Sequence, residues 1–98
     1  MKNVMISLLV TLATTMSFAK GDAAAGKTKS ATCAACHGAG GISPNDLWPN
    51  LKGQKYGYML QALKDYKSGK RDNPLMSPQA KVLSEKDMED LAAYFSGL

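Results

Sequence analysis

The stretch Cys33-Ala34-Ala35-Cys36-His37 contains both cysteines and the only histidine of a chain of 98 residues. Two thiols three positions apart on one turn of chain can reach the two vinyl groups of a single porphyrin. The imidazole that follows is then carried over the iron, where a neutral ring nitrogen can bind it. The spacing C-x-x-C-H is therefore typical of the covalent attachment of a c-type haem.

Two other interpretations of this stretch are open, and each explains less of it. A zinc site needs four ligands, usually cysteine or histidine, and the chain has only three such residues. A thioredoxin-like dithiol uses C-x-x-C on a βαβ scaffold, and the sequence gives no strand signal. Haem attachment also accounts for His37 and agrees with export, because the thioether bonds are made outside the cytoplasm. We therefore prefer it.

Residues 1–19 have the pattern of a secretory signal peptide. A short positive start at Met1-Lys2 precedes a mostly apolar stretch, and Ser17-Phe18-Ala19 offers small residues where a signal peptidase cleaves. A membrane anchor is the alternative, but an apolar stretch of about 15 residues is short for a bilayer span of about 20. We expect cleavage after Ala19, which leaves an exported, soluble, periplasmic protein without a membrane anchor.

Residues 20–98 are expected to form one small domain. A chain of this size buries little surface, so it usually needs a disulfide, a metal or another internal support. A disulfide between Cys33 and Cys36 would close too short a loop to constrain the unfolded chain much. A buried haem is the better support. Loss of Lys2 with the signal peptide would lower the net charge from +4 to +3. The lysines are dispersed, which argues against binding to nucleic acid and favours an acidic protein partner.

The sequence predicts an all-α fold with three main helices. The first is predicted over residues 23–33, with Asp22 as its N-cap and Lys27 and Lys29 facing water. The second is predicted over residues 56–69, where apolar residues recur at helical spacing and a glycine ends the pattern.

The last helix has the clearest signals. Ser84 is predicted to cap it, Asp87 to complete a capping box, and Leu83 and Met88 to form a hydrophobic staple. Its buried stripe is expected to consist of Met88, Leu91, Ala92 and Phe95, and its outward face of Glu85, Lys86, Glu89 and Asp90.

Two long loops are predicted to separate these helices. Residues 38–44 are rich in glycine and residues 71–79 contain two prolines, so neither segment is expected to form an element of its own. Long loops in a small domain need something that organises them. A haem held between the two loops would do so.

Five segments together resemble a class I cytochrome c. They are Cys33 to Gly38, Pro49-Asn50-Leu51-Lys52-Gly53-Gln54, Met76-Ser77-Pro78, Leu83-Ser84-Glu85-Lys86-Asp87 and Leu91-Ala92-Ala93-Tyr94-Phe95. The chain is most similar to the small bacterial c553-type proteins and to one domain of the dihaem cytochromes c4. The first segment is specific, and the others are individually weak but occur in order. The resemblance covers residues 20–98 and implies long loops around one covalently bound haem c.

The resemblance also implies roles for individual residues. Cys33 and Cys36 would form the thioethers, and His37 would be one axial ligand of the haem iron. The Pro49 carbonyl would accept a hydrogen bond from the His37 ring, which makes the other ring nitrogen a stronger donor.

Met76 is the candidate for the second axial ligand. It lies between Pro74 and Pro78, where a side chain can be presented rigidly to a metal, and it matches the ligand loop of the family. Met59 and Met88 lie on apolar helical faces and are expected to pack in the core. With His37 and Met76 both bound to iron, no position is left for a substrate. We therefore expect a carrier of single electrons and not an enzyme.

The function expected from the sequence is that of a soluble monohaem shuttle between redox proteins of a respiratory chain. Its partners would be a donor and an acceptor such as a membrane oxidase or a cytochrome bc complex, and it would be monomeric. A haem-bearing electron-transfer subunit of a larger oxidoreductase complex is the main alternative. A gas sensor is a further one, and it would require an open sixth position on the iron.

Two sets of surrounding residues complete these expectations. Candidate walls of the haem pocket, each equally compatible with plain core packing, are Trp48, Leu51, Tyr56, Leu60, Leu75 and Phe95. A candidate docking face, equally compatible with an ordinary solvated surface, consists of Lys52, Lys55, Lys70, Arg71 and Lys81.

Overall fold

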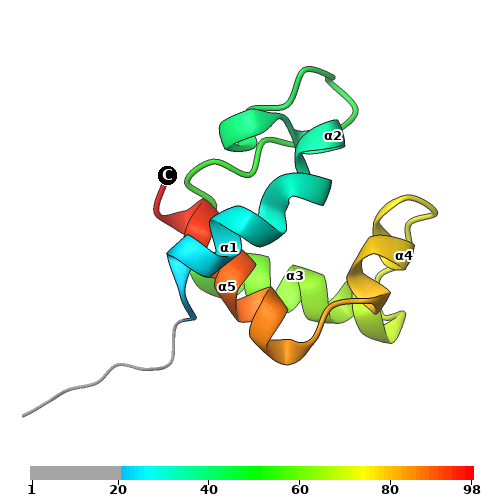
Figure 1. Ribbon diagram of the computed structural model, residues 1–98. Helices are drawn as coiled ribbons and strands as arrows, with labels where there is room; N and C mark the ends of the chain where they lie inside the picture. The colour runs from blue at the N-terminus through cyan, green and yellow to red at the C-terminus, as the bar shows by residue number, and fades with distance from the viewer. Residues whose placement is uncertain (1–20) are drawn as a thin grey trace, which may run out of the picture.

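The computed structural model describes residues 21–98, and within them it is helical without any strand (Figure 1). The proposed signal peptide therefore lies outside the described residues. The α-helices are α1 (Ala23–Lys29), α2 (Ala34–His37), α3 (Tyr56–Ser68), α4 (Met76–Lys81) and α5 (Glu85–Ser96), with short 3-10 turns at Ser30–Thr32 and Ala39–Gly41. The expectation of an all-α fold is confirmed.

Helix α1 packs against α5, so the two ends of the described chain meet (Figure 1). The contact is close because Gly26 of α1 has no side chain. A Cβ atom at Gly26 would lie 2.0 Å from the backbone oxygen of Asp90. Any larger residue at this position would therefore push the two helices apart.

The first predicted helix begins where expected and ends early. The Asp22 carboxylate accepts hydrogen bonds from the backbone N–H groups of Ala24 at 2.9 Å and Ala25 at 3.3 Å, which confirms the N-cap. Regular α-helix stops at Lys29, and residues 30–32 continue as a tighter turn. The Ser30 hydroxyl donates to the Lys27 carbonyl at 2.7 Å, a local bond that competes with helix continuation.

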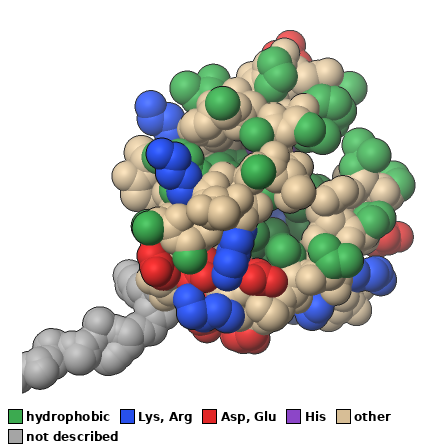
Figure 2. Space-filling model, in the orientation of Figure 1, with side chains coloured by type: hydrophobic (Ala, Val, Ile, Leu, Met, Phe, Trp, Pro, Cys, Tyr) green, Lys and Arg blue, Asp and Glu red, His purple; other side chains and the backbone are tan. Residues whose placement is uncertain are grey.

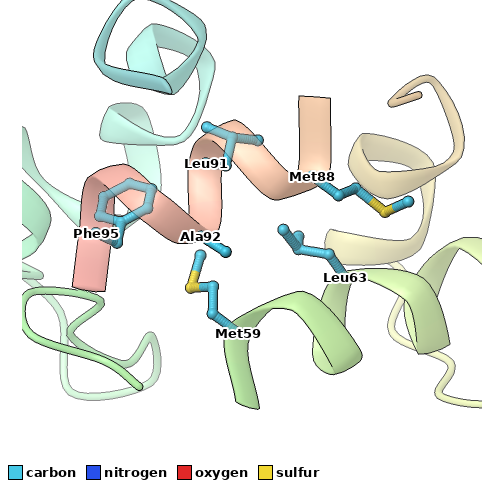
Figure 3. Packing of buried hydrophobic residues seen from close by; sticks show 6 residues of the cluster. All are labelled: Met59, Leu63, Met88, Leu91, Ala92 and Phe95. Carbon is cyan, nitrogen blue, oxygen red and sulfur yellow. The ribbon is translucent and has the colours of Figure 1, made fainter. Parts of the chain in front are cut away.

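The hydrophobic core lies between α3 and α5. It consists of Met59 and Leu63 from α3 and the stripe Met88, Leu91, Ala92 and Phe95 from α5 (Figure 3). The stripe predicted for the last helix is confirmed. Helix α3 also follows the prediction, because it ends at Ser68 and Gly69 adopts a φ of +90°.

The capping box of α5 is confirmed. The Ser84 hydroxyl accepts from the Asp87 N–H at 3.0 Å, and the Asp87 carboxylate accepts from the Ser84 N–H at 2.9 Å. Two of the N–H groups that a helix start leaves unpaired are thereby satisfied.

Asp90 does not face outward as the sequence suggested. It is 0% exposed, because α1 lies over this part of α5. Its carboxylate accepts hydrogen bonds from Lys29 Nζ at 2.7 Å, from the Asp22 N–H at 2.7 Å and from Lys86 Nζ. Lys29 also lies 2.9 Å from Asp87, so it does not simply face water either. Burial alone would raise the pKa of Asp90, but these donors hold it well below its ordinary value.

The two segments predicted as plain loops contain short helices. Met76 is the first residue of α4 and not part of a loop, and residues 39–41 form a 3-10 turn. Pro78 is compatible with α4 because it falls in the first turn, where a backbone N–H has no partner within the helix. Prolines on both sides of Met76 masked this one-and-a-half-turn element in the sequence.

We predict that Asp90→Asn destabilises the folded holoprotein by about 2 to 3 kcal/mol, because it removes the buried charge that Lys29 and Lys86 compensate. Glu85→Gln on the same helix is the matched control. Glu85 forms only an exposed ion pair with Lys64, at 3.0 Å, so its loss should cost less than about 1 kcal/mol. Denaturant unfolding curves measure both values, and equal effects would contradict the importance of burial.

We also predict a loss of stability in acid that depends on these carboxylates. The Ser84 N–H and then Lys29 lower the pKa of Asp87 from 3.8 to about 2, and the pKa of Asp90 is lowered further. The unfolded chain therefore binds more protons over this range, and stability should fall as the pH drops from about 4 to about 2. Asp87→Asn combined with Asp90→Asn should flatten this slope in acid titrations of unfolding free energy, whereas Glu85→Gln should retain it.

Candidate functional site

A cavity of about 500 Å³ opens between the α2 side of the molecule and α4. Figure 2 shows hydrophobic side chains around the opening. Its walls come from α2, from the loop that follows it, and from α3 and α4, and they are mostly apolar. Representative lining residues are Trp48, Leu51, Met59, Leu63, Leu75 and Leu83.

All five residues singled out for cofactor binding line this one cavity. They are Cys33, Cys36, His37, Pro49 and Met76. They come from three separate stretches of sequence, so the fold and not the sequence spacing brings them together.

The two cysteines lie on a single tight turn. The N–H groups of Cys36 and His37 donate to the Cys33 carbonyl at 3.2 and 2.9 Å. Both thiols are free and partly buried, and burial raises the pKa of the Cys33 thiol. The turn therefore presents two free thiols to the same apolar space, without a disulfide between them.

His37 is buried and has one defined partner. His37 is only 7% exposed, and its Nδ1 lies 2.8 Å from the Pro49 carbonyl oxygen. A carbonyl oxygen can only accept, so Nδ1 carries the proton and donates to it. With the proton on Nδ1, the tautomer that binds a metal is the one whose lone pair is on Nε2.

The loop after α2 folds back to bring Pro49 to His37. The Gly41 carbonyl accepts from the N–H groups of Leu51 at 2.8 Å and Lys52 at 3.1 Å. The turn that starts the loop requires glycine at position 38, where φ is +83° and a Cβ would lie 1.8 Å from the Ile42 carbonyl oxygen. The short sequence separation between His37 and Pro49 is thus converted into a direct contact.

Met76 lies on the α4 side of the cavity at the start of that helix. The Asn73 side-chain oxygen accepts from the N–H groups of Leu75 at 2.8 Å and Met76 at 2.9 Å. The Asn73 N–H in turn donates to the Ser77 hydroxyl at 3.0 Å. These bonds fix the backbone that carries the Met76 thioether.

The other two methionines of residues 21–98 differ in position. Met59 and Met88 are both buried in the core, as the sequence suggested. Met59 also lines the cavity, whereas Met88 is not among its lining residues. Met59 is therefore the second thioether near the site.

The expected pocket walls are correct in part. Trp48, Leu51 and Leu75 line the cavity, whereas Tyr56, Leu60 and Phe95 belong to the core or pack against it. Sequence reasoning missed Leu47 and Val82, which line the cavity while being 84% and 80% exposed. The sequence could have indicated them only as apolar residues that belong to no helical stripe and so need another partner.

The expected basic face reaches the cavity at one point. Arg71 lines it and lies with its guanidinium carbon 4.5 Å from the centre of the Tyr66 ring. Lys52, Lys55, Lys70 and Lys81 are exposed and lie outside the lining.

The residues of this cavity fit one haem and do not fit the alternatives. Two free thiols, an imidazole with its Nε2 lone pair available and a thioether face a space with apolar walls, as a flat apolar ring with a metal requires. Among residues 21–98 no group of three or more His, Cys, Asp or Glu side chains could hold a metal ion such as zinc. The same residues contain no strand for a thioredoxin-like scaffold.

Hydropathy adds one finding on membranes. Within residues 21–98, no helix combines the length and apolarity needed to cross a bilayer.

Comparison with known proteins agrees with the geometry. The family model described as Cytochrome c matches residues 23–98. Cytochrome c4 of Pseudomonas aeruginosa is 46% identical over 97 residues, which cover 98% of this chain and 48% of the relative. Cytochrome c-554(548) of Halomonas halodenitrificans is 46% identical over 79 residues, which cover 78% of this chain and 95% of the relative. This chain thus spans about half the length of its cytochrome c4 relative.

A solved structure gives the same result for the fold. The crystal structure of reduced recombinant cytochrome c4 from Pseudomonas stutzeri matches with a TM-score of 0.74 at 44% identity, over 78% of this chain and 45% of that one. The helical fold, the C-x-x-C-H turn facing an apolar cavity and these matches lead to one conclusion. The chain belongs to the cytochrome c family, and its cofactor is a covalently bound haem c.

Proposed function

We propose that this protein is a soluble, periplasmic, monohaem c-type cytochrome that transfers single electrons between redox proteins. The observation that carries the proposal is the presence of both His37 and Met76 in the lining of one cavity. If both residues bound the haem iron, no position would be left for a substrate, as is expected of a carrier and not of an enzyme.

Each site residue has one task in this proposal. Cys33 and Cys36 would form the two thioether bonds, His37 would bind iron through Nε2, and Met76 would bind it through its sulfur. When bound, the haem supplies a one-electron couple, and a thioether ligand raises its reduction potential. The Pro49 carbonyl holds the His37 ring in one tautomer and orientation.

The cavity walls contribute by excluding water and by holding the ligands still. The backbone at Met76 is fixed by the hydrogen bonds from the Leu75 and Met76 N–H groups to the Asn73 side chain, at 2.8 and 2.9 Å. The His37 ring is fixed by its 2.8 Å contact with the Pro49 carbonyl oxygen. Fixed ligands and apolar walls keep the site similar in both oxidation states, which favours fast electron transfer.

Export and the choice of partner rest on the sequence. Residues 1–19 read as a cleavable signal peptide, and thioether bonds to haem are made outside the cytoplasm. Cleavage removes Lys2 and lowers the net charge from +4 to +3, a positive balance that favours acidic partners. The partners proposed are a donor and an acceptor of a respiratory chain, such as a cytochrome bc complex and a membrane oxidase.

A haem-bearing subunit of a larger oxidoreductase is the second candidate, and exposed apolar side chains favour it. Leu47, Leu75 and Val82 line the cavity and are 57% to 84% exposed. A shuttle sediments as a monomer after purification from its native host. A subunit co-purifies with a catalytic partner that covers these side chains.

The assignment of Met76 gives a direct test. Oxidised wild-type holoprotein should show the weak near-infrared sulfur-to-iron charge-transfer band, and Met76→Ala should abolish it because the thioether is lost. Met59→Leu is the matched control, since it removes the other thioether of the cavity lining and should leave the band intact. Absorption spectra of the three proteins decide the question.

The outcomes of this test separate the candidates. A band that persists in Met76→Ala and disappears in Met59→Leu would move the ligand to Met59. Ready binding of carbon monoxide by the ferrous wild-type protein at neutral pH would contradict the carrier proposal and support a gas sensor.

Loss of haem attachment should also remove the fold. In the double variant Cys33→Ser, Cys36→Ser, the apolar walls of the 500 Å³ cavity would face water without a cofactor. We expect this protein to lose cooperative thermal unfolding in circular dichroism, while wild-type holoprotein retains it. A cooperatively folded double variant would show that α3 and α5 suffice as a core.

A further inference from the structure

The loop that carries Pro49 is cross-linked at the point next to this residue. The Asn50 side-chain oxygen accepts a hydrogen bond from the Ser43 N–H at 2.7 Å. Asn50 and Ser43 lie seven residues apart on the two arms of the loop. The bond therefore joins the arm that leaves α2 to the arm that returns to His37.

Ser43 extends this link to the haem-attachment turn. Its hydroxyl lies 2.9 Å from the Asn45 carbonyl oxygen and 3.4 Å from the Cys36 carbonyl oxygen, and it accepts from the Asn45 N–H at 3.1 Å. A closed ring of contacts thus runs from Cys36 through Ser43 and Asn50 to Pro49, and back through His37.

Covalent geometry makes Asn50 the member of this ring that sets the Pro49 carbonyl. The carbonyl belongs to the peptide group between Pro49 and Asn50, which is planar. A restraint on Asn50 therefore also restrains the direction in which the Pro49 oxygen points. That oxygen lies 2.8 Å from His37 Nδ1.

We propose that Asn50 is a positioning residue, whose side chain holds the Pro49 carbonyl in hydrogen-bonding contact with His37. This inference rests on the proposed role of His37 as an axial ligand. Through the contact, Asn50 acts on the electron density of the ring nitrogen that binds iron. A stronger donor favours the ferric state, so loss of the contact raises the reduction potential.

The position of the Ser43–Asn50 bond makes the effect separable from unfolding. The bond is exposed, and neither Ser43 nor Asn50 is among the residues of the core or those packed against it. Removing it leaves the packing of Phe95 and Leu91 untouched. A change at His37 in an Asn50 variant is therefore a local effect.

The test compares three variants of the oxidised and reduced holoprotein. Asn50→Ala removes the acceptor, and Asn50→Asp retains an acceptor oxygen in the same place. Asn73→Ala is the matched control, because the Asn73 side-chain oxygen likewise accepts backbone hydrogen bonds, in this case from Leu75 and Met76. The readouts are the exchange rate of the His37 Nδ1 proton by NMR, the midpoint potential and the sulfur-to-iron band.

We expect the His37 Nδ1 proton to exchange about tenfold faster in Asn50→Ala, because this factor corresponds to the loss of roughly one hydrogen bond. The midpoint potential should shift upward in this variant, with the sulfur-to-iron band retained. Asn50→Asp should restore the wild-type exchange rate. Asn73→Ala should weaken the band and leave the exchange of the His37 proton unchanged.

Two results would overturn the proposal. The first is an Asn50→Ala variant whose His37 proton exchange rate and midpoint potential equal those of the wild type. The second is an Asn73→Ala variant whose His37 proton exchanges as fast as in Asn50→Ala, which would indicate general loosening of the fold. Failure of the proposed function is visible separately. If wild-type His37 ring protons lack the large shifts of an iron ligand, the ligand assignment fails, while the exchange comparison still decides whether Asn50 holds the Pro49 carbonyl.

Discussion

The close crossing of α1 over α5 is the constraint on which the rest of the structure depends. Gly26 allows the crossing, because a Cβ at this position would lie 2.0 Å from the α5 backbone. The crossing sets the direction of both arms that surround the cavity. The arm after α1 carries the Cys33–His37 turn, and the arm before α5 carries Met76 (Figure 1). The packing of α1 on α5, together with that of α4 on α3, therefore helps to set the distance between the two sets of ligands.

The same crossing explains the buried charge at Asp90. A carboxylate under a crossing helix loses its water, which is tolerated only when donors replace it. Lys29 and the Asp22 N–H supply two of these donors from the α1 side, and Lys86 supplies one from α5. The interaction works only in one relative placement of the helices. It therefore specifies how α1 and α5 are placed relative to each other, whereas Gly26 only allows them to approach closely.

Local signals in the sequence predicted local structure well. The Asp22 cap, the Ser84 capping box and the apolar stripe of α5 each depend on residues within one or two turns, so their patterns are complete in the sequence. The burial of Asp90 could not be predicted, because it depends on a helix more than 60 residues away. An acidic residue on a polar helical face carries no mark of what will cover it.

The candidate site shows the same division. Cys33, Cys36 and His37 form a motif that is readable without a fold, and all three line the cavity. The helix that begins at Met76 was hidden by flanking prolines, and the link from Ser43 to Asn50 has no signature in the sequence. Leu47 was not expected at the opening. A periodic pattern shows which side of a helix packs in the core, but it does not show which residues outside helices contact a cofactor.

The cavity joins stability and function in one physical requirement. In residues 21–98 the buried core is one small cluster between two helices, while many other apolar side chains face the cavity instead. The covalently bound haem supplies a flat apolar partner against which those side chains gain burial. Side chains of the cavity wall thus both stabilise the folded chain and keep water from the iron. A substitution on the cavity wall should therefore change the stability of the fold and the environment of the metal together. A substitution at Asp90 should change mainly the stability, and one at Asn50 mainly the environment of the metal.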